Sequence, residues 1–136
     1  MLWRRPKIVQ DPDLGVLTHH AKPHDHWASQ SIATSAGDVL IDLPGDALAP
    51  HQTSLASAKQ ALLNSDQLAA SAISYLHTNI TAQEFIEGQG ELILDGFSFT
   101  ETPGSFTVEL GLSNWPDAMI SVVFDGGIPH DVLLAD

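Results

Sequence analysis

Residues 51–78 read HQTSLASAKQALLNSDQLAASAISYLHT, the only long stretch of the chain that combines helical periodicity with an absence of Gly and Pro. Its apolar side chains form two series with steps of three and four residues: Leu55, Ala58 and Leu62, then Leu68, Ala72, Tyr75 and Leu76. This spacing places an apolar stripe along one side of a helix, and the stripe needs a sheet to cover. Asn64, Ser65 and Asp66 favour helix caps, so we predict two helices that meet at a tight corner.

The segments on both sides of this stretch alternate apolar and polar residues, which predicts strands. The predicted strands cover residues 14–18, 27–33, 39–43, 91–100, 106–112, 118–125 and 131–135, and a short helix through Glu87 starts at a capping box of Thr81 and Glu84. This order predicts one α+β domain over residues 1–136, in which a central helix pair packs on one face of a mainly antiparallel sheet.

The alternation also predicts which side chains are buried. Residues 106, 108, 110 and 112 are apolar and the residues between them are Thr, Glu and Gly, as in a sheet with one dry and one wet face. We expect Trp27 in the core, because a tryptophan that opens an apolar strand is more often buried than exposed. The other predicted members of the core, placed between helices and sheet, are Leu62, Leu76, Phe106, Val108 and Val122.

Charge is the strongest signal in the composition. The chain has 17 acidic and 5 basic residues and a formal net charge of −12, which argues against binding to nucleic-acid phosphates and favours a basic protein partner. No Lys or Arg follows Lys59, so the acidic residues of the second half are not balanced. The same charge also serves solubility, and composition alone does not separate the two interpretations.

Signals for other compartments and for cofactors are missing from the sequence. There is no cysteine, and no apolar run follows the basic residues 1–7, so we expect neither a secretory signal nor a membrane span, and a cytoplasmic location. The segment His19–His26 contains a His-x-His pattern that can bind zinc, but Pro23 marks it as a connector and no further ligand spacing supports a metal. We therefore expect no cofactor.

No residue pattern names a reaction. The chain has no Gly-x-Ser-x-Gly elbow, phosphate-binding loop or EF-hand loop, and nothing in the sequence brings Tyr75, His77 and Glu84 into one cleft. We therefore expect a protein that is not an enzyme. The alternatives are a small ligand-binding or metal-binding enzyme that uses the segment His19–His26, and a housekeeping interaction module.

A resemblance to known proteins follows from the overall pattern. It rests on Leu14 to Leu17, on Trp27, on Gly37 to Leu43, on the helices from Leu55 to Leu76, and on the closing strands from Phe106 to Phe124. Together these segments resemble small bacterial α+β families of uncharacterised function, several of which are similar to immunity proteins encoded beside polymorphic or secretion-system toxins.

The resemblance implies that the protein works by binding. Its acidic surface would cover the active cleft of a cognate toxin, which is basic if the toxin is a nuclease. The expected contact residues are the carboxylates at strand ends, turns and outward strand positions, together with one tryptophan: Glu87, Glu91, Glu101, Glu109, Asp117, Asp125 and Trp115.

Overall fold

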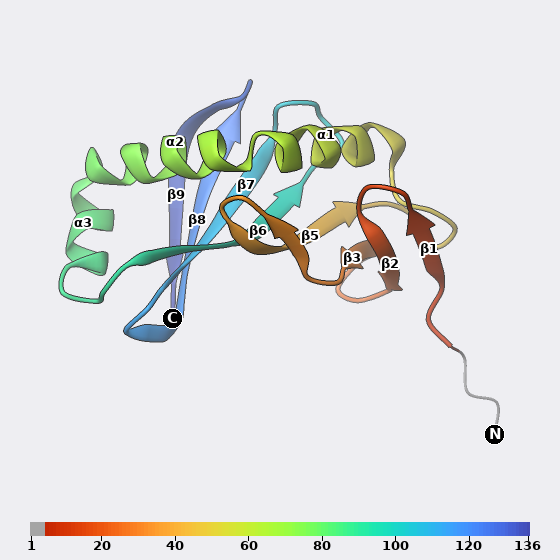
Figure 1. The fold of residues 1–136 in the computed structure, drawn as a ribbon, viewed down its shortest axis with the longest axis horizontal. Coiled ribbons are helices and arrows are strands. Elements are labelled where there is room, and N and C mark those ends of the chain that lie inside the picture. The colour runs from red at the N-terminus through yellow and green to blue at the C-terminus, as the bar shows by residue number, and fades with distance from the viewer. Residues whose placement is uncertain (1–4) are drawn as a thin grey trace.

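The computed structural model describes residues 5–136, which form nine strands and three helices (Figure 1). Residues 1–4, which begin the basic stretch at the start of the chain, lie outside the described part. The strands are β1 (Ile8–Asp11), β2 (Gly15–His20), β3 (His26–Ser29), β4 (Ile32–Thr34), β5 (Gly37–Pro44), β6 (Leu92–Phe99), β7 (Phe106–Leu112), β8 (Trp115–Asp125) and β9 (Ile128–Ala135). The helices are α1 (Gln52–Leu63), α2 (Ser65–His77) and α3 (Ile80–Ile86). The protein therefore has a mixed α/β fold that is rich in strands.

The strands form one sheet in the order β1-β2-β3-β5-β6-β7-β8-β9, and β4 pairs with the first part of β5. Neighbouring strands are antiparallel except for β5 and β6, which are parallel. Parallel neighbours need a crossover connection, and here the chain makes it with all three helices between Pro44 and Leu92. The helical segment thus joins an N-terminal group of strands to a C-terminal meander.

Cross-strand pairs show that the sheet has two different faces. One row of partners, Ile41, Phe97, Val108, Val122 and Val132, is apolar, and all of its members but the half-buried Val132 are fully buried. The helices lie along this side in Figure 1, where α1 contacts β5 and β6 and α2 contacts β7 and β9. The opposite side, which we call the open face, contains the next row of partners: Leu40, Gly96, Glu109, Ser121 and Leu133.

The helical stretch breaks where the sequence predicts. Asn64 has φ −116° and ψ 22°, which separates α1 from α2. The two helices run end to end across the molecule in Figure 1, so the predicted tight corner is wrong, and the predicted packing as a central pair is not confirmed. The predicted capping box of α3 is wrong: the cap is Asn79, whose side-chain oxygen accepts a hydrogen bond of 2.9 Å from the Ala82 N–H. Asn79 reaches the free N–H groups of the first turn from outside the helix, whereas Thr81 already lies within that turn.

Most of the predicted core is buried. Trp27 is inaccessible, and its indole N–H donates to the Asp46 carbonyl oxygen at 3.0 Å. Leu76, Phe106, Val108 and Val122 are buried as well. Leu62 is only half-buried and packs against the edge of the core, so its placement in the centre is wrong.

The N-terminal strands differ most from the prediction. The strand β1 was not predicted, and the predicted strand 27–33 is two strands that pair with different parts of β5: β3 with Asp42 to Pro44 and β4 with Gly37 to Val39. The histidine segment is not all connector, because His19 and His20 end β2 and His26 begins β3. These differences arise because pairing with distant strands determines where the strands lie, and local sequence patterns do not encode that pairing.

Candidate functional site

The predicted contact residues are accessible, with two exceptions. The exposed carboxylates are Glu87, Glu91, Glu101, Asp117 and Asp125. Glu109 is half-buried, because its carboxylate accepts hydrogen bonds from the hydroxyls of Thr107, at 2.6 Å, and of Ser121. Trp115 is half-buried too, and its ring stacks on Phe85 with a centroid distance of 4.7 Å.

These residues do not form one patch. Glu91 precedes β6, while Trp115 and Asp117 begin β8, and the pairing of Leu92 with Leu112 and of Leu112 with Trp115 places all three at one end of the meander. Glu87 follows α3 directly. Glu101 and Asp125 lie at the opposite end, where Phe99 and Phe124 both pair with Phe106. Glu109 lies between the two ends, in the middle of the open face.

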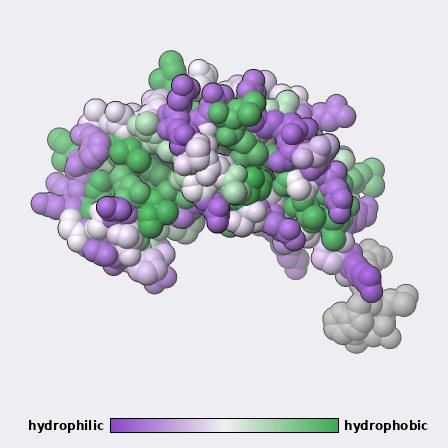
Figure 2. All heavy atoms as spheres, viewed as in Figure 1, coloured by the Kyte–Doolittle hydropathy of each residue, from purple (hydrophilic) through white to green (hydrophobic). Residues whose placement is uncertain are grey.

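The open face combines acidic and apolar side chains. Its acidic residues include Glu109, Asp42, which pairs with Ser98 across the strands, and Asp131, which pairs with Val123. Many of the large hydrophobic residues that the described part leaves exposed also belong to this face: Ile8, Leu40, Ile93, Met119 and Leu133. Figure 2, drawn in the orientation of Figure 1, shows hydrophobic residues gathered among hydrophilic ones over the visible surface as a whole. No strand of the sheet contains Lys or Arg.

A groove of about 370 Å³ runs over β3, β5, β6 and β7 on this face. We define the groove by the residues that matter for its chemistry and depth: His26, Ala28, Leu40, Asp42, Asp95, Gly96, Ser98 and Glu109. Two small residues, the buried Gly96 and the half-buried Ala28, are part of its lining. Gly96 has a structural reason as well: a Cβ at this position would lie 2.2 Å from the Leu40 carbonyl oxygen.

The groove contains two pairs of ionisable groups, His26 with Asp42 and Asp95 with Glu109. His26 Nδ1 lies 2.7 Å from Asp42 Oδ1, and its Nε2 lies 3.2 Å from the Lys22 carbonyl oxygen, so both ring nitrogens have partners. The hydrogen bond to Asp42 raises the pKa of His26 above its ordinary value, against the opposing effect of burial. Asp95 is exposed, but partial desolvation by the surrounding groove and the nearby Glu109 carboxylate raise its pKa. The groove is therefore a site where negative charge is crowded.

The His26 pair makes a prediction for pH dependence. A raised pKa in the folded protein means that the contribution of the pair to stability is fully present below the ordinary His pKa of about 6.5 and is lost as the pH rises through the folded value. We expect Asp42→Asn to lower the free energy of unfolding by about 1 kcal/mol at pH ~5.5 and by much less at pH ~9. Urea unfolding at both pH values measures this difference. An equal loss at the two values would show that the pair carries no ionic component.

Asp42 and Asp95 are not among the predicted site residues, and His26 was predicted only as part of the histidine segment. One signal was available for Asp95, because an isolated glycine such as Gly96 inside a strand pattern marks a bulge or a close backbone approach. The bulge is present between Leu94 and Gly96. Asp42 and His26 carry no such signal, since only the pairing of β3 with β5 brings them together.

The histidine segment does not gather into a metal site. His19 Nε2 lies 2.8 Å from Asp25 Oδ1, and the rings of His20 and His26 stack with a centroid distance of 5.2 Å. Within residues 5–136 no group of three or more His, Cys, Asp or Glu side chains is arranged to hold a metal ion. The predicted absence of zinc stays a prediction.

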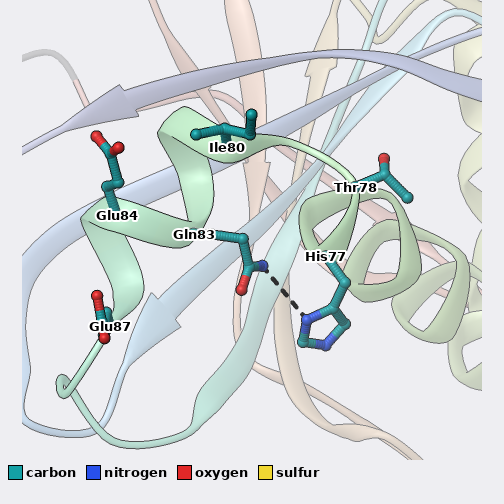
Figure 3. A pocket seen from close by; sticks show the side chains of 6 residues that line it. All are labelled: His77, Thr78, Ile80, Gln83, Glu84 and Glu87. Atoms are coloured by element: carbon teal, nitrogen blue, oxygen red, sulfur yellow. Dashed lines mark hydrogen bonds between the residues drawn. The ribbon is translucent and has the colours of Figure 1, made fainter.

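A second pocket, of about 420 Å³, lies beside α3 and includes His77 and Glu84 but not Tyr75 (Figure 3). Gln83 Nε2 lies 3.3 Å from His77 Nδ1 and also donates to the Leu76 carbonyl oxygen at 2.8 Å. Figure 3 shows Glu84 and Glu87 extending away from the imidazole ring. The geometry thus offers no acid–base pair at this pocket.

A comparison of the chain with protein-family models, with curated proteins and with solved structures finds no match. The resemblance to immunity proteins therefore stays a prediction. Among residues 5–136, no helix has the length and apolar character needed to cross a membrane. The fold and the groove define a mixed α/β protein with a helix-covered face and an acidic open face.

Proposed function

We propose that the protein is a binding protein of the immunity type, which recognises a basic protein partner and neutralises a cognate toxin by covering its active cleft. The observation that carries this proposal is the charge of the sheet: its strands contain carboxylates and no Lys or Arg. Lys59, the last basic residue, is already paired with Asp11 and Asp13 at 3.1 and 3.4 Å. In the part of the chain that the structure describes, no Lys or Arg forms an ion pair with a carboxylate of the open face, and this negative surface complements a basic cleft.

Salt and charge removal test the proposal together. The tagged protein captures its partner from cells of the source organism, and toxicity of the captured partner is measured with and without the protein. Raising the ionic strength from about 0.05 to 0.5 M shortens the Debye length from roughly 14 to 4 Å, so we expect association to slow and the complex to weaken steeply.

A variant in which the six predicted contact carboxylates are neutralised tests the same proposal by removing the charges themselves. Exposed charges contribute about 0.2 to 1 kcal/mol each, so we expect this variant to lose at least about tenfold in affinity and to protect poorly against the toxin. The residues changed to Gln or Asn are Glu87, Glu91, Glu101, Glu109, Asp117 and Asp125. Binding that is independent of salt and of these six changes would contradict the electrostatic mechanism. Trp115→Ala then tests whether an apolar contact carries the affinity instead.

One observation favours a second candidate, a small-ligand protein or enzyme that uses the histidine segment. His26 does line a groove together with carboxylates, as such a protein requires. Against acid–base chemistry, both nitrogens of His26 are engaged by Asp42 and the Lys22 carbonyl oxygen. This candidate predicts that a free small cation binds the groove as tightly as a cationic side chain of a protein does.

A further inference from the structure

We infer that the basic partner docks on the open face of the sheet and inserts a Lys or Arg side chain into the groove. This inference rests on the proposed function and adds to it the surface and the anchoring group. The partner is a protein whose contact surface carries a cationic side chain surrounded by apolar ones.

The open face lacks a covering layer. The main contacts of the helices with the sheet fall on β5, β6, β7 and β9, on the side of the buried apolar row and not on the open face. Leu40, Met119 and Leu133 are 56%, 60% and 59% exposed although they occupy three different strands of the sheet. Exposed hydrophobic residues that share one face beside polar groups are typical of a protein-binding surface.

The carboxylates of the groove are arranged for a cation. Glu109 is fixed by hydroxyl donors from Thr107 on its own strand and from Ser121 on β8, so its position does not depend on a partner. Within residues 5–136 the Asp95 carboxylate accepts no hydrogen bond, and it lies over Gly111, where a Cβ would be 2.7 Å from Asp95 Oδ2. A guanidinium group has five N–H donors and no acceptor, which suits two neighbouring carboxylates with free lone pairs.

The pKa values agree with this geometry. The pKa of Asp95 is raised by partial desolvation and by Glu109, so a cation between the two carboxylates would relieve their repulsion. His26 and Asp42 already form an ion pair with each other, so the negative charge of the groove that has no cation beside it lies on the Asp95 side. The apolar neighbours explain why the cation belongs to a protein: a side chain brings apolar surface to Leu40 and Met119, and a free amine does not.

A titration followed by NMR tests the inference. The ¹⁵N-labelled protein is titrated at low salt with an acetylated hexapeptide amide of alternating leucine and arginine, and separately with methylguanidinium. We expect saturable peptide binding, with amide shifts concentrated on Leu40, Gly96, Glu109 and Met119, and binding of methylguanidinium at least tenfold weaker than that of the peptide.

Two double variants remove the same amount of charge from different places. Asp95→Asn with Glu109→Gln changes the groove, and we expect it to weaken peptide binding at least tenfold. Asp66→Asn with Glu84→Gln changes the helices, and we expect affinity within twofold of wild type. The amide spectrum of each variant reports whether the fold is kept, and Asp95→Asn alone replaces the groove variant if that variant does not fold.

Four outcomes would overturn the inference. Shifts on the helices, or equal weakening in the two double variants, would place the contact elsewhere and leave the proposed basic partner standing. Methylguanidinium binding as tight as that of the peptide would make the groove a small-ligand site. Absence of saturable peptide binding would remove the anchoring role of the groove, whereas the proposed function is decided by capture of the partner.

Discussion

Replacing Leu76 with alanine is expected to lower the free energy of unfolding by about 2 to 5 kcal/mol. Leu76 lies in the last turn of α2 and is completely buried in the core between the helices and the sheet. Truncation removes the apolar contacts of the side chain and leaves a cavity that the surrounding core fills only in part. Loss of Leu76 therefore weakens the attachment of the helical crossover to the sheet.

The matched control is Leu63→Ala in α1. Leu63 is 82% exposed, so the same chemical change there is expected to alter the free energy of unfolding by no more than about 0.5 kcal/mol. Urea unfolding of the two variants and the wild type measures both values. A Leu76→Ala variant as stable as Leu63→Ala would mean that α2 does not pack on the sheet as described.

Local sequence patterns predict the helices and the buried faces of single strands, because interactions between residues near each other in the sequence determine these features. The helical periodicity of residues 51–78 locates α1 and α2, and the alternation from Phe106 to Leu112 assigns the buried face of β7. Trp27 was expected in the core and is buried there. In each case the side chains that decide the structure are neighbours in the sequence or repeat at the period of one element.

These local patterns do not predict which distant segments pair with each other. β5 and β6 are parallel neighbours although the whole helical segment separates them in the sequence, and no feature of either strand alone predicts this pairing. The same pairing builds the groove, because it places Leu40 and Asp42 beside Gly96 and Ser98. The exposure of most acidic residues was predictable from their positions in turns, but their separation into two ends and a central face was not.

The parallel contact of β5 with β6 is thus the feature on which both fold and groove depend. At Gly96 the Leu40 carbonyl oxygen of β5 occupies the space that a side chain would need. We expect Gly96→Ala to lower the free energy of unfolding by about 1 to 3 kcal/mol or more, since a backbone atom of the neighbouring strand must move to admit the methyl group.

Gly111→Ala is the matched control for this prediction. Gly111 lies in the adjoining strand β7, and the atom that its new Cβ would approach, at 2.7 Å, is Oδ2 of the Asp95 side chain, which can rotate away. We therefore expect Gly111→Ala to lower the free energy of unfolding clearly less than Gly96→Ala, although both substitutions add one methyl group. Urea unfolding compares the two, and amide spectra show whether the Gly96 variant shifts β5. A Gly96→Ala variant no less stable than Gly111→Ala would mean that β5 and β6 have room between them at this position, contrary to the approach of the Leu40 carbonyl oxygen.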